Sequence, residues 1–184
     1  MYMDISMNKI GIFFGTDTGN TGLIANKIAK SLGDDIASTP QNINKTNLDN
    51  LMQYDALILG TPSYGDGLFP GYSTGIEDGS WEEFIPQLCN ANLIGKKIAL
   101  YGLGNQEEYP ECFADALFFL YVLFNHCGAR IVGDWSTDNY NFIQSKAVVD
   151  GRFVGLVLDH HNQEFLTDLR LDAWLAKVKP MLLY

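Results

Sequence analysis

The chain has 184 residues, of which 47% are hydrophobic and 18% charged, so its composition excludes a disordered chain and predicts a single domain over residues 1–184. The formal net charge of −10 disfavours nucleic acid and anionic membrane surfaces as partners, and it favours a basic partner. No apolar run approaches the roughly 20 residues of a membrane span, and we expect no signal peptide. Cys89, Cys112 and Cys127 show no disulfide or zinc-site spacing, which favours reduced thiols in the cytoplasm.

Short apolar runs alternate along the chain with segments of helical spacing. Runs of this kind that end in glycine are typical of buried parallel strands. In the first half they predict a strand at Ile10–Phe14, a helix at Gly19–Leu32, a weak strand at Asp35–Ala37, a short helix at Leu48–Tyr54 and a strand at Ala56–Leu59. Gly33 follows the first helix and is expected to end it.

The second half continues the alternation. It predicts a helix at Trp81–Leu88, a strand at Lys97–Leu103, a helix at Glu111–His126, a last strand from Arg130–Val132 and Leu156–Leu158, and a closing helix at Glu164–Val178. Ser80 and Glu83 have the spacing of a capping box before the first of these helices. The closing helix is amphipathic through Phe165, Leu169, Leu171, Trp174, Leu175 and Val178.

About five repeats of strand and helix predict an α/β fold, a doubly wound five-stranded parallel sheet with right-handed crossovers. The polar stretch Gly133–Gly155 has no helical period and is expected to be an insertion that interrupts the last strand. Ligands of such sheets bind outside the carboxyl ends of the strands. The loops after the first, third and fourth strands are therefore the candidate functional segments.

The first of these loops is GTDTGNT, Gly15–Thr21, which opens directly into a helix. Backbone N–H groups at a helix N-terminus bind anions, and threonine hydroxyls add donors. Neither GxxxxGK[ST] nor GxGxxG is present, and Gly11–Asn26 contains no Lys or Arg, which argues against a triphosphate or a dinucleotide. A terminal monophosphate held by neutral donors fits best. The alternative is a tight turn and helix cap without a ligand.

The other two loops each present a tyrosine. TPSYGDG, Thr61–Gly67, carries Tyr64 between a stiffening proline and two glycines, and GLGNQEEYP, Gly102–Pro110, ends with Tyr109. Two tyrosines on neighbouring strand ends can enclose a flat ring by offset stacking. Either tyrosine alone is more typical of a surface or packing residue, so the prediction depends on their occurring together beside the phosphate loop.

These motifs resemble those of flavodoxins over nearly the whole chain. GTDTGNT resembles the T-x-T-G-x-T phosphate loop of that family, TPSYGDG the loop facing the inner side of the flavin, and GLGNQEEYP the loop whose tyrosine covers the outer face. GDWSTDNYNF and FVGLVLDHHNQ resemble the insertion and the last-strand end of long-chain flavodoxins. GLFPGYSTGIEDGSWEEFIPQL is similar to the nitrogenase-associated subgroup. The resemblance implies the strand order 2-1-3-4-5.

The resemblance also implies non-covalently bound FMN. It implies that the phosphate is held by Thr16, Asp17, Thr18, Gly19, Asn20 and Thr21, that one side of the flavin is lined by Thr61, Pro62, Ser63, Tyr64 and Gly65, and that the other side is lined by Leu103, Gly104, Asn105 and Tyr109. The chain departs from the family pattern at Leu68, where Glu often stands, at Asn105, where Asp is common, and at His161, where Asp is often found. Each change removes a carboxylate near the ring, so typical redox potentials are not implied.

The function that follows is that of a one-electron carrier. As the resemblance implies, a monomeric carrier would shuttle electrons from a flavodoxin/ferredoxin reductase to acceptor enzymes, with nitrogenase reductase a candidate acceptor. No metal-ligand spacing and no catalytic constellation is evident: His126 is expected to be structural, and Cys89 and Cys112 to be small hydrophobes or bystanders near the site. Between Thr46 and Ala129 the only Lys or Arg are Lys96 and Lys97, whereas the acids number eleven: Asp49, Asp55, Asp66, Glu77, Asp78, Glu82, Glu83, Glu107, Glu108, Glu111 and Asp115.

Two other functions remain open from the sequence. An FMN-dependent NAD(P)H quinone reductase of related fold would need a second substrate pocket, usually built by oligomerisation. A phosphoacceptor signalling domain of the same topology would need an acidic cluster after the first strand, where this chain has Phe14, Gly15 and Thr16.

Overall fold

The computed structural model describes residues 10–16 and 19–184. A parallel sheet forms the centre of the molecule, in the order β2-β1-β3-β4-β5 that the sequence predicts. Its strands are β1 (Ile10–Phe14), β2 (Gln41–Asn42), β3 (Ala56–Pro62), β4 (Lys97–Leu103) and β5 (Arg130–Val132). β1, β3 and β4 are almost completely buried because helices cover both faces of the sheet, which explains their continuous apolar sequences.

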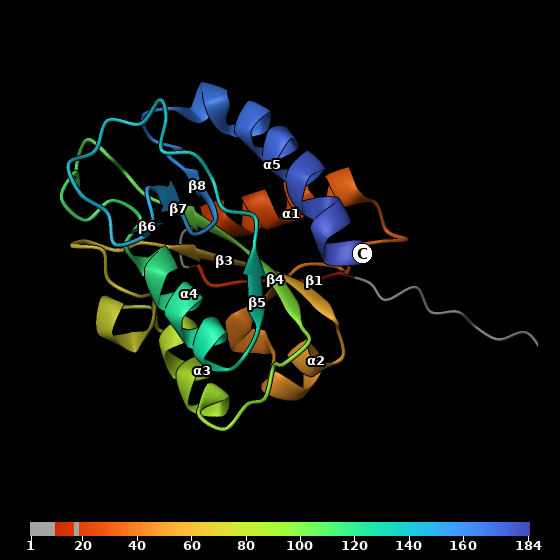
Figure 1. Ribbon diagram of the computed structural model, residues 1–184. Helices are drawn as coiled ribbons and strands as arrows, with labels where there is room; N and C mark the ends of the chain where they lie inside the picture. The colour runs from red at the N-terminus through yellow and green to blue at the C-terminus, as the bar shows by residue number, and fades with distance from the viewer. Residues whose placement is uncertain (1–9, 17–18) are drawn as a thin grey trace, which may run out of the picture.

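The five α-helices lie in two layers (Figure 1). α1 and α5 cover one face of the sheet, and α3 and α4 cover the other. Their bounds are α1 Asn20–Leu32, α2 Leu48–Met52, α3 Trp81–Leu88, α4 Ala116–His126 and α5 Thr167–Leu183, and 3-10 turns occupy Ile43–Lys45, Tyr72–Thr74 and Glu164–Leu166. Within residues 10–16 and 19–184, no helix combines the length and the hydropathy that a membrane crossing requires.

The last strand is interrupted, as predicted. β5 pairs with the first half of β4, where Ala99 lies opposite Val132, and β8 (Leu156–Leu158) pairs with the second half, where Tyr101 lies opposite Leu156. The insertion between the two pieces contains an antiparallel hairpin of β6 (Val148–Val149) and β7 (Arg152–Phe153).

The start of the fourth helix and the position of the second strand differ from the prediction. The second strand was expected at Asp35–Ala37, but Ala37 makes only an isolated bridge to Ile10, and the strand forms at Gln41–Asn42. The fourth helix was expected from Glu111, but it begins at Ala116 because Ala114 has φ 55°, which no α-helix accommodates. The strand was misplaced because the apolar Ile36 belongs to the turn that follows α1, and Ala37 pairs at a single position only.

The closing helix is longer than predicted, and part of its expected apolar face is exposed. It continues past Pro180 to Leu183, and Leu171, Trp174, Leu175 and Val178 are buried against the sheet. Phe165 and Leu169, however, are 80% and 68% exposed. Phe165 belongs to the 3-10 turn Glu164–Leu166, so it does not follow the helical period on which the prediction was based.

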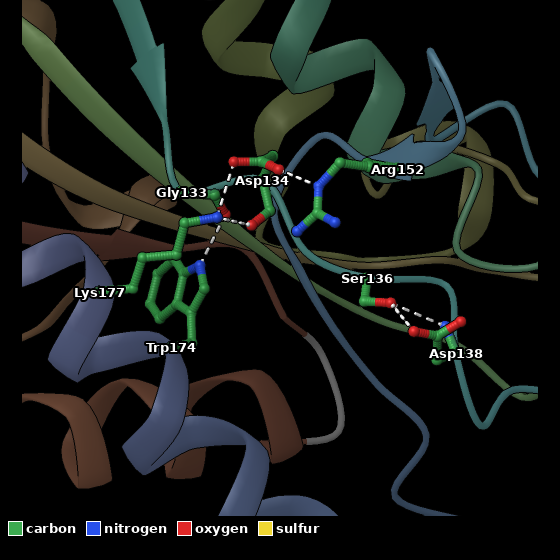
Figure 2. A network of polar contacts seen from close by, with 7 residues as sticks. All are labelled: Gly133, Asp134, Ser136, Asp138, Arg152, Trp174 and Lys177. Carbon is green, nitrogen blue, oxygen red and sulfur yellow. Dashed lines mark hydrogen bonds and ion pairs between the residues drawn. The ribbon is translucent and has the colours of Figure 1, made fainter.

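A polar network attaches the insertion to α5 (Figure 2). Lys177 Nζ donates to the carboxylate and to the carbonyl oxygen of Asp134, each over 2.7 Å, and Arg152 of the hairpin donates to the second carboxylate oxygen. Trp174 Nε1 donates to the Gly133 carbonyl over 2.7 Å. The Lys177 hydrogen bond, joined by that of Arg152, lowers the pKa of the Asp134 carboxyl despite its partial burial.

A second attachment is centred on Tyr140. Its hydroxyl donates to the Val157 carbonyl over 2.5 Å and accepts from Trp135 Nε1 over 3.1 Å. The Arg170 guanidinium of α5 lies 3.9 Å from the centre of the Tyr140 ring, a cation–π contact. Burial raises the pKa of Tyr140 to about 12, so the hydroxyl stays a donor at physiological pH. The insertion is therefore fixed to β8 and α5 at separate points.

Replacing Asp134 by Asn should weaken the attachment in a pH-dependent way. A lowered carboxyl pKa stabilises the folded state above the ordinary Asp value, and this contribution is lost as pH falls through the lowered pKa. Because the side chain is 49% exposed, screening limits the effect to about 0.5–1 kcal/mol at pH 7. Urea unfolding should show the variant to be less stable than wild type at pH 7, with a smaller difference at pH 3.

Asp138→Asn is the matched control, since Asp138 is exposed and its carboxylate bonds only locally, to Ser136. An equal loss of stability at pH 7 in Asp138→Asn and Asp134→Asn would contradict the role of Asp134 in attaching the insertion to α5.

Candidate functional site

A cavity of about 160 Å³ opens at the carboxyl ends of β3 and β4, beside the start of α1. Its lining includes ten of the residues proposed from the sequence: Asn20, Thr21, Pro62, Ser63, Tyr64, Gly65, Leu103, Gly104, Asn105 and Tyr109. Thr16, Gly19 and Thr61 lie in the same loops but not in the lining. Asp17 and Thr18 lie outside the described residues. The three loops picked out by motif thus converge on one site.

The first loop ends in an arrangement suited to an anion. Gly19 has φ 89° and donates its N–H to Thr16 Oγ1 over 3.1 Å. Thr21 is 1% exposed, and its hydroxyl oxygen has no hydrogen-bond partner among the described residues. A buried hydroxyl without a partner is costly, so a ligand with an acceptor group here would remove that cost.

The base of this loop is held by close packing. The Gly60 carbonyl accepts from Gly15 N over 3.0 Å and from Trp81 Nε1 over 2.8 Å. A Cβ on Gly15 would lie 2.5 Å from the Trp81 ring, so only glycine fits there. The Tyr101 hydroxyl, beneath the loop, donates to the Thr21 carbonyl over 2.9 Å. These contacts fix where α1 begins relative to β3 and β4.

The second loop is folded back on itself. Tyr64 and Leu68 exchange backbone hydrogen bonds of 3.1 and 2.7 Å, which closes a turn containing Gly65 at φ 46°. Ser63 ties this loop to its neighbours, because its N–H donates to the Leu103 carbonyl over 3.1 Å and its hydroxyl accepts from Ala116 N over 3.1 Å. The turn therefore holds Tyr64 at the cavity.

The third loop turns on Asn105. Asn105 Oδ1 accepts from Glu108 N over 3.0 Å and from Asn162 Nδ2 over 2.9 Å, and Nδ2 donates to the Glu108 carboxylate over 3.1 Å. A hydrogen bond to Glu108, together with the negative charge of that residue, raises the pKa of Tyr109. Gly104 allows the close approach of the chain, since a Cβ there would lie 2.9 Å from the Ala114 nitrogen.

A buried carboxylate, Asp159, joins the third loop to the end of β8. It is 1% exposed and accepts hydrogen bonds from Gln106 N over 3.1 Å and from Asn162 N over 3.0 Å. Asn162 Nδ2 also donates to both of its oxygens. Sequence reasoning did not single out Asp159, although an acid directly after a buried strand was a visible signal.

Five lining residues were not among the binding residues proposed from the sequence, although the resemblance placed His161 near the ring: Glu108, Cys112, Ala114, His160 and His161. The last two come from the end of β8, a fourth segment that the three-loop argument did not include. Burial is the main cause that raises the pKa of the Cys112 thiol, so Cys112 is expected to stay protonated and unreactive. His126, which was expected to be structural, is exposed in the last turn of α4.

Comparison with known proteins identifies the family and the fold of this chain. The family model described as Flavodoxin matches residues 12–174. The chain belongs to the flavodoxin family. It is 49% identical to a flavodoxin of Klebsiella pneumoniae over 94% of this chain and 98% of the relative, and 40% identical to a flavodoxin of Synechocystis sp. over 96% and 99%.

Solved flavodoxin structures agree with this assignment. The structure of Fusobacterium nucleatum flavodoxin bound to flavin mononucleotide superposes with a TM-score of 0.84 at 31% identity, covering 96% of this flavodoxin and 99% of that chain. The predicted family and the predicted doubly wound fold are both confirmed.

Replacing Asp159 by Asn should loosen the third loop of this flavodoxin. One oxygen becomes an NH₂ group that cannot accept from Gln106 or Asn162, which leaves a buried donor unpaired at a cost of about 1–3 kcal/mol. Urea unfolding should show that loss, and Asp172→Asn, at an exposed position of α5, should unfold like wild type. Equal stability of the Asp159 and Asp172 variants would show that the buried carboxylate does not hold the loop.

Proposed function

We propose that this flavodoxin binds FMN non-covalently in the cavity and carries single electrons in the cytoplasm between a reductase and acceptor enzymes. The observation that carries the proposal is the convergence of the three loops, with the buried, unpartnered Thr21 hydroxyl beside the helix start where a phosphate would bind. The FMN reported in the Fusobacterium nucleatum flavodoxin supports the choice of ligand. The chain's free cysteines, Cys89, Cys112 and Cys127, suit a reducing compartment.

The residues present fit such a cofactor. The backbone and hydroxyls of Thr16–Thr21 would hold the phosphate, while the loops carrying Tyr64 and Tyr109 would enclose the ring system and keep water from it. FMN, when bound, supplies the redox chemistry. The protein supplies position and electrostatics, and Asn105 and Glu108 are the polar groups that shape the third loop beside the ring site.

An acidic rim around the cavity would steer basic partners such as a flavodoxin/ferredoxin reductase. Asp66, Glu107, Glu108 and Glu111 are exposed next to the Tyr64 and Tyr109 loops. Asp115, in contrast, is buried, where it accepts from Lys146 N over 2.7 Å and lies 3.6 Å from Lys146 Nζ.

Two other acids of the run, Glu82 and Glu83, form hydrogen bonds inside the molecule. Glu82 and Glu83 accept backbone N–H bonds from Ser73 and Tyr72, over 2.9 and 3.0 Å. The negative charge available to partners beside the cavity is thus smaller than the run of eleven acids suggests.

Thr21→Val should weaken the binding of FMN while leaving that of riboflavin nearly unchanged. A hydrogen bond to a charged phosphate contributes about 1.5–3 kcal/mol, so the FMN dissociation constant should rise roughly tenfold to a hundredfold. Fluorescence titration of apoprotein with both ligands measures this. Thr167→Val is the control, because Thr167 also has a buried, unpartnered hydroxyl but lies outside the cavity. A wild type that binds both flavins equally would remove the phosphate site from the proposal.

Electron transfer from a reductase should slow steeply as ionic strength rises. The Debye length falls from about 30 Å at 0.01 M to about 8 Å at 0.15 M, which screens the attraction between the acidic rim and a basic partner. Stopped-flow reduction by a reductase over this range measures the effect. A rate that does not depend on salt would contradict steering, and rapid NAD(P)H-driven quinone reduction without a reductase would favour the enzyme alternative.

Asn105→Asp should lower the potential of the second electron added to bound FMN by tens of millivolts. The new carboxylate would stand close to the ring and about 3.1 Å from that of Glu108. A negative charge ~6 Å from the reduced ring would repel it by roughly 3 kcal/mol at a dielectric of 20, and screening by solvent reduces this repulsion to about 1 kcal/mol. For a one-electron couple, 59 mV corresponds to ~1.4 kcal/mol, so the shift is tens of millivolts. Spectroelectrochemical titration measures the shift. Asn90→Asp, exposed beyond α3, adds the same charge elsewhere, so an equal effect of both variants would contradict a local cause.

A further inference from the structure

Two adjacent histidines stand on the rim of the cavity, and they are the groups in its lining that can become positively charged. His160 and His161 both line it, together with the acid Glu108, and the lining contains no Lys or Arg. The third histidine of the chain, His126, is exposed at the end of α4 and does not line the cavity. Although the protein has a net charge of −10, the cavity is therefore lined by two groups that can carry positive charge.

His160 is partly buried and incompletely satisfied. Its Nε2 lies 3.6 Å from the Glu164 carboxylate, while its Nδ1 is shut off from solvent and has no hydrogen-bond partner among the described residues. The residue lines both the cavity and the groove between α1 and α5. A buried ring nitrogen without a partner is costly, so it indicates a site that a bound molecule would complete.

The turn that carries the two histidines is held at both ends. The Asp159 carbonyl accepts from Gln163 N over 2.9 Å, and the Asp159 carboxylate accepts from Asn162 N over 3.0 Å. Asn162 is in turn bonded to Asn105 in the third loop. The imidazoles therefore stay beside the cavity when their charge changes, because the backbone on either side of them is fixed.

The charged and titratable groups around the two imidazoles come from three directions. Glu164 belongs to the 3-10 turn before α5, and Asp168 to the first turn of α5. Lys27 and Lys30 belong to α1, and Glu108, Tyr109 and Cys112 to the loop before α4. Lys27 is paired with Asp168 over 2.5 Å. The positive charge of Lys27 is thus balanced locally.

We propose that His160 and His161 couple the uptake of an electron at this site to the uptake of a proton from solvent. The inference rests on the proposed FMN function. An electron from an external one-electron donor adds negative charge in the cavity, and this favours the protonated form of a neighbouring imidazole, which takes its proton from water. Because coupling between two binding events is reciprocal, protonation raises the potential, and the effect disappears at a pH where the imidazoles stay neutral.

The test compares holoprotein of wild type, His160→Asn plus His161→Asn, and the matched control His126→Asn. FMN binding is measured first at pH 8, and failure of wild type to bind FMN would contradict the proposed function itself. Spectroelectrochemical titration from pH 5.5 to 8.5 should then show the potential of the second electron rising as pH falls. We expect a slope at least twofold smaller in the double variant than in wild type and in His126→Asn. Equal slopes in all three proteins would overturn the proposal.

A second readout on wild type keeps the proposal testable if the double variant does not fold. Proton NMR titration of the histidine ring protons, in the oxidised and the fully reduced holoprotein, follows each imidazole separately. Reduction should move the titration midpoint of His160 or His161 to higher pH while that of His126 stays in place. Midpoints that do not change on reduction, or a change equal at all three histidines, would overturn the coupling.

Discussion

The carbonyl of Gly60 is the contact on which the geometry of the site depends. It receives hydrogen bonds from Gly15 at the end of β1 and from the indole of Trp81 at the start of α3, so one acceptor joins two strand ends and a helix. Both bonds need the backbones to approach closely, and a Cβ on Gly60 would lie 2.0 Å from the ring of Tyr101. Tyr101 then reaches the carbonyl of Thr21. The position of the first loop of the site therefore follows from packing inside the sheet rather than from the loop itself.

The sequence predicts those parts of the fold that follow from burial. β1, β3 and β4 are readable because strands covered on both faces must be apolar throughout. β2 is not readable, since only Gln41 and Asn42 pair and their side chains are not buried. The start of α4 depends on the left-handed conformation of Ala114, which alanine rarely adopts and which no local pattern announces.

The residues of the candidate site also fall into those that the sequence predicts and those that it does not. Loops that bind through backbone and glycine geometry have recognisable motifs, and the motifs led to Thr21, Tyr64, Gly104 and their neighbours. The places of Asp159 and His160 depend on the tertiary arrangement: after the insertion, Asp159 accepts a hydrogen bond from the third loop and His160 lines the cavity. Net charge is similarly incomplete as a guide: Asp115, Asp134 and Asp159 are used for internal contacts, so the surface potential cannot be obtained by counting acids.

The register of the interrupted strand has a consequence for the length of the insertion. Val132 lies opposite Ala99 and Leu156 opposite Tyr101, so Gly155 falls beside Leu100, the one position between them. The chain thus leaves the sheet beside the first half of β4 and returns beside the second half, with only the position of Leu100 between the two pairings. β4 therefore aligns both pieces of the last strand, and the length of the segment between them does not set the register of either piece.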